Sequence, residues 1–186
     1  RAFFRHKLLG RNRLGIYCSW DKHMHFAHNQ CGEKGEALPV AIILGMHPAL
    51  HIGGVSPVSD TMGEDEYAVV GGLLGEPVEL VPCKTIPLEV PAEAEIVIEG
   101  RILPHVRQTE GPFGEYHRYY GQIVDAPEIE VTAITHRKDA IYHDVGQYIE
   151  HVTATLVPNE GHMLRELRRF FPTVRAVHAP LSGVLY

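Results

Sequence analysis

The chain has 186 residues, of which 45% are apolar and 22% charged, and this composition fits one globular domain, or one domain with part of another. It excludes a disordered tail, a collagen-like chain and a disulfide scaffold, and the longest apolar stretch, residues 37–46, has about half of the roughly 20 residues that a membrane span needs. The net charge of −6 with neutral histidines gives no electrostatic indication of nucleic acid or anionic lipid as a partner.

The first half of the chain predicts short strands joined by turns. We expect strands over Leu14–Cys18 and Ala37–Gly45, the second buried on both faces because it is a continuous aliphatic run. The His-, Gly- and Pro-rich stretch Met46–Asp60 is predicted to be mostly loop. A short helix is expected over Glu66–Leu74, ending at Gly75.

The second half adds strands and one clear helix. Strands are expected over Pro77–Cys83, Glu93–Leu103, Glu128–His136, Ala140–His143 and Thr173–His178. In Glu128–His136, apolar residues alternate with Glu128, Glu130 and Thr132, which predicts one buried and one wet face. Asn159 is expected to cap a helix that runs to Phe171. The chain is therefore predicted to be mainly β with some α (α+β), and a barrel or sandwich fits better than a doubly wound sheet.

The segment Thr109–Glu115, with the sequence Thr-Glu-Gly-Pro-Phe-Gly-Glu, carries the densest chemical signal. A turn there can bring Glu110 and Glu115 toward one site, and neighbouring carboxylates push their pKa values apart, as acid/base catalysis needs. The alternative is a solvated turn with two ordinary surface acids, which a motif this short does not exclude.

Three further groups of residues could bind ions. His23, His25 and His28 lie between Cys18 and Cys31, a possible zinc module, although no pair has the usual ligand spacing and a solvated loop is favoured. The acids of residues 64–66 either stabilise a helix N-terminus or donate a carboxylate to a hard divalent cation. The basic start of the chain, residues 1–13, shows no specific pattern by itself.

Several catalytic classes have no support in the chain. It contains no Walker loop, GxGxxG, GxSxG, HExxH or kinase motif. Its three cysteines are too few and too scattered for a disulfide framework, so a reducing, cytoplasmic compartment is expected.

The order of several motifs resembles the UbiD family of decarboxylases, over nearly the whole chain. The most specific is Glu-Gly-Pro-Phe-Gly-Glu (110–115) after the strand Glu-Ile-Val-Ile-Glu-Gly (95–100). Other matching segments are 10–16, 38–41, 66–75, 81–84, 88–92, 119–121 and 134–143.

The resemblance implies a fold, an activity and cofactors. The family's members are reversible, non-oxidative decarboxylases of aromatic and α,β-unsaturated acids. They use prenylated FMN with a divalent metal, usually Mn²⁺ (or Mg²⁺), and K⁺. Their central domain is a split β-barrel of the flavin-reductase-like type. By this resemblance the partners are a small carboxylic acid as substrate, a flavin prenyltransferase that supplies the cofactor, and further copies of the chain in a homo-oligomer.

The resemblance also implies the site residues. Arg5 would steer the substrate carboxylate and pair with Glu110, and Glu115 would deliver the proton that replaces carbon dioxide. His23 and Glu66 would bind the metal at the flavin phosphate, with His25 and Asp21 as alternatives to His23. Arg5, His23 and Glu66 would thus also hold the cofactor.

By the same resemblance we expect a fragment, in which residues 1–150 form the central cofactor-binding domain and residues 151–186 begin a C-terminal α/β domain. Two features depart from the family: its metal-binding asparagine would precede Arg1, and Arg118 stands where many relatives have glycine. A non-catalytic flavin-binding or assembly subunit of a multi-subunit carboxylase is therefore the alternative function.

Overall fold

The structure is a computed structural model that describes residues 6–17, 23–55, 65–114, 119–143 and 149–179. The chain divides into two compact units, each built from three segments. Unit 1 comprises Arg1–Met46, Glu79–Phe113 and Gly121–Asp144, and unit 2 comprises His47–Val78, Gly114–Tyr120 and Val145–Tyr186. Within the described residues, no helix is long and apolar enough to cross a membrane.

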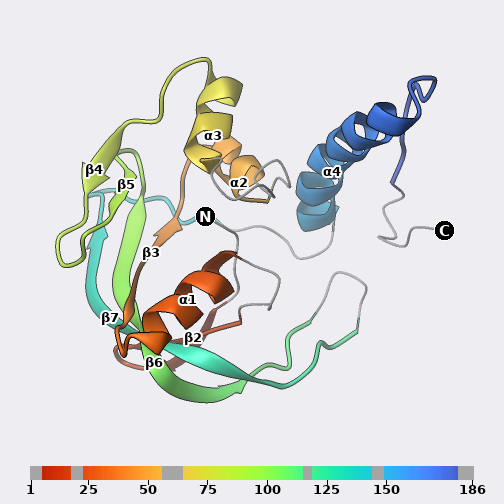
Figure 1. The fold of residues 1–186 in the computed structure, drawn as a ribbon. Coiled ribbons are helices and arrows are strands. Elements are labelled where there is room, and N and C mark those ends of the chain that lie inside the picture. Colours follow the sequence, from red (N-terminus) through yellow and green to blue (C-terminus); the bar gives the residue numbers. More distant parts are fainter. Residues whose placement is uncertain (1–5, 18–22, 56–64, 115–118, 144–148, 180–186) are drawn as a thin grey trace. The chain divides into compact units, whose positions relative to one another are not determined.

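Unit 1 is built on a five-stranded antiparallel sheet with the order β1-β2-β7-β6-β3 (Figure 1). Its strands are β1 (His6–Gly10), β2 (Arg13–Ile16), β3 (Leu38–Leu44), β6 (Ile96–Glu110) and β7 (Val124–His136). The long pair β6 and β7 forms the centre, so the N-terminal hairpin β1–β2 is attached through β7. This order brings the start of the chain beside residues more than a hundred positions later.

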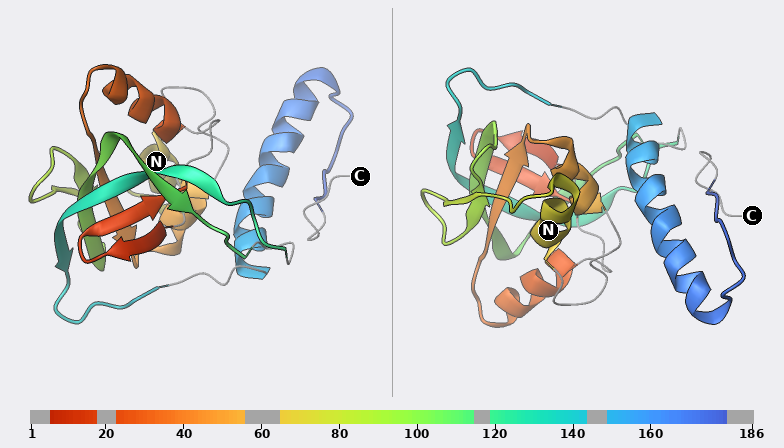
Figure 2. Two further views of the ribbon diagram at one scale, coloured as in Figure 1. Left: turned by 90° about the horizontal axis from the view of Figure 1, so that it is seen from below. Right: turned by 90° about the horizontal axis from the view of Figure 1, so that it is seen from above.

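The sheet curls instead of lying flat. Two strands separated by a third would lie about 9.6 Å apart in a flat sheet, twice the strand spacing of about 4.8 Å. Cα atoms of β2 and β6 nevertheless come within 8 Å of each other although β7 lies between them. Lys7 on β1 also reaches β6, where its Nζ donates to the carbonyl oxygen of Thr109 at 3.4 Å. Figure 2 shows the curvature of β6 and β7 from two sides.

The core of unit 1 lies on one face of this curled sheet. Ile16, Val40, Ile102 and Ile129 come from four different strands and form one buried cluster. Helix α1 (His23–Glu33) contacts β3 and β6, and its Met24 packs against the cluster. The burial of side chains from four strands thus holds β2, β3, β6 and β7 in one layer.

A two-stranded hairpin, β4 (Leu80–Pro82) and β5 (Glu89–Pro91), completes unit 1. Val90 of this hairpin packs with Ala94 and Val97 in a second buried cluster. The loop between the two strands is held by Glu99 of β6, which accepts hydrogen bonds from the backbone nitrogens of Lys84 (2.7 Å) and Thr85 (2.6 Å). One buried carboxylate therefore joins the hairpin loop to the main sheet.

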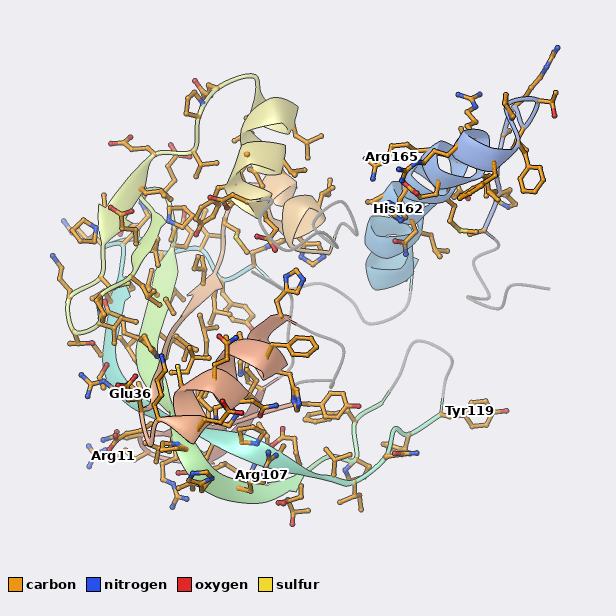
Figure 3. The ribbon with its side chains drawn as sticks, in the orientation of Figure 1. Arg11, Glu36, Arg107, Tyr119, His162 and Arg165 are labelled. Atoms are coloured by element: carbon orange, nitrogen blue, oxygen red, sulfur yellow. The ribbon has the colours of Figure 1, made fainter. Side chains whose placement is uncertain are left out.

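Unit 2 contains three helices, α2 (Pro48–Val55), α3 (Glu66–Leu74) and α4 (Ile149–Phe170). The Asp65 side chain accepts a hydrogen bond from the backbone nitrogen of Tyr67 at the start of α3, and Gly75 ends the helix in the left-handed conformation at φ 80°. Helix α2 approaches α3 closely, because a Cβ at Gly53 would lie 2.4 Å from Val70 Cγ2. On α4, His162 and Arg165 lie side by side (Figure 3), with Arg165 Nη2 3.2 Å from His162 Nδ1.

The structure has the mixed, mostly β architecture that the sequence predicted, but several predicted elements are wrong. The stretch 46–60 is not mostly loop, since α2 lies within it. The C-terminal helix begins at Ile149 and includes Asn159 in its interior. Residues 140–143 and 173–178 contain no strand.

Two burial predictions are also wrong. The strand predicted over residues 37–45 is half-buried along most of its length, not buried on both faces. Glu128 does not face water: it is buried and accepts hydrogen bonds from Arg13 Nε and Nη2. The guanidinium lies alongside both carboxylate oxygens, which compensates for the burial of the charge.

Candidate functional site

Three of the five predicted site residues, Glu110, His23 and Glu66, lie within the described part of the chain. Arg5 and Glu115 lie outside the described residues, as do Asp21, Cys18 and Arg118. Glu110 and His23 belong to unit 1, whereas Glu66 belongs to unit 2. The assignments of Arg5, Glu115, His23 and Glu66 therefore stay predictions.

Glu110 is the last residue of β6 and is completely buried, with an exposed fraction of 0%. Its Oε2 accepts a hydrogen bond of 2.5 Å from Gln108 Nε2. Its Oε1 has no hydrogen-bond partner among the described residues. A buried carboxylate oxygen without a donor is costly, so Oε1 of Glu110 is an atom at which a binding partner is expected.

The chain turns sharply after Glu110. Gly111 has φ 87°, a left-handed conformation that favours glycine, and a Cβ there would lie 2.7 Å from the carbonyl oxygen of Gln122. The backbone nitrogen of Gly121 donates to the carbonyl oxygen of Phe113 at 2.8 Å. The glycine and this cross-link fix the exit of the chain from β6, and with it the end of the strand that carries Glu110.

A backbone position on β2 makes room for the Glu110 side chain. A Cβ at Gly15 would lie 1.9 Å from Glu110 Oε2 and 2.3 Å from Gln108 Nε2. Gly15 pairs with Lys7 on β1, whose Nζ reaches the carbonyl oxygen of Thr109. Residues 7 and 15 therefore both approach residues 108–110, and the curl of the sheet makes this contact possible.

The histidine-rich segment forms a helix rather than a loop. His23 is half-buried at the first position of α1, and His28 is buried on the same helix. His28 Nε2 donates to the carbonyl oxygen of Leu103 at 3.2 Å. Burial lowers the pKa of the His28 imidazole, and the nearby Arg107 acts in the same direction. The His28 ring is therefore a neutral group that connects α1 to β6.

The zinc-module alternative gains no support from this helix. Cys31 is a free thiol on α1, and His28 already uses Nε2 for the sheet. Within the described ranges, no three histidine, cysteine, aspartate or glutamate side chains gather as a metal site. Cys18, another residue of the predicted module, lies outside these ranges.

Glu66 is buried in the first turn of α3. The capping role in this helix belongs to Asp65, so the Glu66 carboxylate is not used as the N-cap. Carboxylate oxygens suit Mn²⁺ and Mg²⁺ as ligands. The residue type and position of Glu66 thus fit the predicted metal ligand.

Sequence reasoning missed Gly15 and Gln108. A signal for Gln108 existed, because side chains two residues apart on a strand project to the same face. The sequence predicts that the strand ends at Leu103, seven residues before Glu110. It therefore gives no reason to place residues 108 and 110 on the same face of one strand. For Gly15 no local signal exists, because its contact with Glu110 depends on the curl of the sheet.

The hairpin end beyond Glu110 exposes aromatic side chains. Tyr119 and Tyr120 are 75% and 79% exposed, and Tyr119 points away from the ribbon (Figure 3). Gly114 and Tyr120 form an isolated antiparallel bridge.

Comparisons with known proteins place this geometry in context. The family model described as "UbiD: 3-octaprenyl-4-hydroxybenzoate carboxy-lyase Rift-related domain" matches residues 2–148. An evolved dimeric form of the UbiD-class enzyme HmfF from Pelotomaculum thermopropionicum, in complex with prFMN, matches with a TM-score of 0.93 and 40% identity. That match covers 98% of this chain and 42% of the HmfF chain.

Two decarboxylases are also similar. The apo 3,4-dihydroxybenzoic acid decarboxylase AroY from Klebsiella pneumoniae has a TM-score of 0.89 and 32% identity, over 98% of this chain and 40% of its own. The vanillic acid decarboxylase of Sedimentibacter hydroxybenzoicus in closed form has a TM-score of 0.86 and 29% identity, over 94% of this chain and 37% of its own. The chain thus spans about two fifths of the length of these structures.

Proposed function

The chain belongs to the UbiD family, as its motifs predicted, and we propose that the protein is a carboxy-lyase that removes carbon dioxide from an aromatic or α,β-unsaturated acid. The single observation that carries the proposal is Glu110. It is a fully buried carboxylate with one oxygen held by Gln108 and the other unpartnered among the described residues. The similarity to two decarboxylases supports the same reaction class.

Prenylated FMN is the cofactor in this proposal, and when bound it supplies the electron sink for the bond that breaks. Arg5 binds and orients the substrate carboxylate through its planar guanidinium. Glu110 holds that guanidinium through its unpartnered oxygen. Glu115 donates the proton that takes the place of carbon dioxide on the substrate carbon.

The metal and the remaining assignments follow the same proposal. His23 and Glu66 hold Mn²⁺ or Mg²⁺, and K⁺ is the second cation at the cofactor phosphate. These ions are structural, because they neutralise phosphate charge and take no part in the proton step. Residues 1–150 act as the cofactor-binding domain and residues 151–186 begin a second domain, although α4 spans this boundary.

The split β-barrel is also part of the proposal. It is supported by the approach of β2 to β6 across β7 and by the contact from Lys7 to Thr109. The proposal also includes a homo-oligomer that works in the cytoplasm and receives its cofactor from a flavin prenyltransferase. The match to a dimeric form of HmfF supports the oligomer.

The first test is cofactor capture followed by turnover. The protein is co-expressed with a flavin prenyltransferase, supplied with Mn²⁺, and examined by absorption spectroscopy and mass spectrometry of bound small molecules. We expect bound prenylated FMN and release of carbon dioxide from a panel of acids that includes vanillic and 3,4-dihydroxybenzoic acid. Glu115→Gln should keep the cofactor and lose turnover, because it removes the proton donor.

Three results would separate the alternatives. Protein that binds the cofactor but acts on no acid supports the non-catalytic flavin-binding or assembly subunit. Retained turnover in Glu115→Gln contradicts the assignment of the proton donor. Protein that stays free of flavin contradicts the cofactor assignment itself.

A further inference from the structure

Gln108 and Glu110 form a fixed pair at the end of β6. Both side chains project to the same face, because they are two residues apart on a strand. The hydrogen bond from Gln108 Nε2 to Glu110 Oε2 is 2.5 Å long, and the carboxylate that accepts it is fully buried. Because the Glu110 carboxylate is shielded from water, the hydrogen bond from the Gln108 side-chain amide fixes its orientation.

Gly15 forms the opposite wall of the same space. A Cβ added at Gly15 would lie 1.9 Å from Oε2 at the end of the Glu110 side chain and 2.3 Å from Nε2 at the end of the Gln108 side chain. No backbone atom is among the three nearest. A methyl group at position 15 would therefore displace the carboxylate and the amide, while the pairing of β2 with β1 and β7 can persist.

The two oxygens of Glu110 are thereby distinguished. Oε2 lies between Gln108 and Gly15, and Oε1 has no partner among the described residues. A carboxylate held by one oxygen presents the other at a defined position. Such fixed placement is what a group that orients a reacting partner requires, since an error of about 1 Å can cost on the order of 100-fold in rate.

We infer that Gln108 and Gly15 are positioning residues for Glu110: Gln108 fixes the carboxylate by a hydrogen bond, and Gly15 leaves the volume that the carboxylate occupies. This inference rests on the proposed function, because it takes Glu110 as a member of the reacting site. Neither residue has to touch the substrate.

A purely structural role makes a different prediction. If Gln108 only compensated the burial of the Glu110 charge, its loss would lower the free energy of unfolding and leave kcat per folded molecule unchanged. A positioning role lowers kcat per folded molecule and moves the carboxylate. The ratio of the change in kcat to the change in KM separates the two roles.

The test compares two single variants, their double variant and one control variant of the whole, cofactor-loaded protein. Gly15→Ala and Gln108→Met should each lower kcat by about 10- to 100-fold, with a smaller change in KM and an unchanged flavin content. The double variant should be little worse than the poorer single variant, since both act on one carboxylate. Gly10→Ala is the matched control, because a Cβ at this position on β1 meets no atom within 4 Å, and it should keep wild-type kcat.

Crystal structures of the wild type and of Gly15→Ala give a readout that needs no turnover. The Glu110 carboxylate should be displaced in Gly15→Ala, with β1, β2 and β7 superimposable. Wild-type kcat in Gly15→Ala and Gln108→Met, or an unmoved carboxylate, would overturn the inference while the proposed function stands. If loaded wild-type protein decarboxylates no acid in the panel, the proposed function fails, and the role of Gln108 and Gly15 in that reaction fails with it.

Discussion

At the scale of single residues, three of the four buried glutamates among the described residues differ in how their charge is satisfied. Glu99 accepts hydrogen bonds from Lys84 and Thr85, and Glu128 is paired with Arg13. Glu110 is the third, and only one of its oxygens has a donor among the described residues. Glu99 and Glu128 have both carboxylate oxygens bonded, as buried carboxylates usually do, so the incomplete bonding of Glu110 supports the site role proposed for it.

The sequence predicted Glu110 as a site residue but did not predict its contacts with Gln108 and Gly15. The motif at 110–115 identifies the position, because it is specific and lies in one continuous segment. The contact with Gly15 joins residues from β2 and β6, and depends on a sheet curvature that no local pattern encodes. The burial of Glu99 and Glu128 was missed for a similar reason, because their partners come from other strands.

Glu99 gives a prediction for stability and its dependence on pH. Burial raises the pKa of Glu99, but the hydrogen bonds from Lys84 and Thr85 outweigh this, and the pKa lies below its ordinary value of 4.5. The stabilisation is therefore fully present above that ordinary value and is lost as the pH falls through the lower pKa of the folded state. Glu99→Gln should lower the free energy of unfolding by about 1.5–3 kcal/mol at pH 7, and by less in acid.

Urea unfolding at pH 7 and at pH 3 measures both effects. Glu89→Gln is the matched control, because Glu89 lies exposed on β5 of the same hairpin. It should change the free energy of unfolding little at either pH. Equal loss of stability in Glu99→Gln at both pH values would contradict the role given to the charge.

At the scale of elements, helix α3 was predicted to the residue, whereas α2 and α4 were not. Helix α3 has its own start and stop signals, Asp65 and Gly75. Helix α2 contains two glycines, and Gly53 is required where Val70 of α3 approaches the backbone. Helix α4 continues through Pro158, which sequence rules treat as a boundary. Where such local signals are weak, as in α2, or argue against a helix, as in α4, tertiary packing determines whether the helix forms and where it ends.

Two glycines of α3 should respond oppositely to alanine. Gly75 adopts φ 80° after the last turn, so Gly75→Ala should destabilise the protein by about 1 kcal/mol through backbone strain. Gly72 is exposed in the helix interior, and Gly72→Ala should stabilise by about 0.5–1 kcal/mol. At both positions a Cβ meets no atom within 4 Å, so packing does not obscure the result.

Thermal and urea unfolding of the two variants, measured side by side, provide the check. Each variant serves as the control for the other, because the same methyl group is added to the same helix. A shift of the same sign in both would show that the cap at Gly75 does not govern the end of α3.

At the scale of the whole molecule, the sequence predicted a mostly β protein with a few helices, and the structure agrees. The order β1-β2-β7-β6-β3 was not predictable from the pattern of strands alone, because it is set by pairing between distant segments. The family resemblance predicted a fold for the whole chain, because its motifs match over nearly the full length. Hydrophobic periodicity predicted only the individual strands and helices.

The sheet order predicts how protection from hydrogen exchange is distributed. β2, β6 and β7 each have a bonded strand on both sides, and β6 and β7 are much the longer of the three, so the amides of β6 and β7 should exchange most slowly among the strands. The two-stranded hairpin β4–β5 should exchange faster, since isolated pairs are marginal. Mass spectrometry of deuterated peptides from the whole protein measures this order. In Glu99→Gln, faster exchange should be confined to residues 83–91, whereas Glu89→Gln should match the wild type, and a uniform increase would contradict a local role.

The pairing of β2 with β7 has a consequence for synthesis on the ribosome. Arg13 and Glu128 are 115 residues apart in the sequence, yet they bond directly. At about 5–20 residues per second, the N-terminal hairpin waits on the order of 6–23 s before its partner strand emerges. During that interval its outer edge is open to other nascent chains. The turn at residues 10–13 carries two arginines, and these charges together with Lys7 are suited to keep that early hairpin from pairing with the wrong strand.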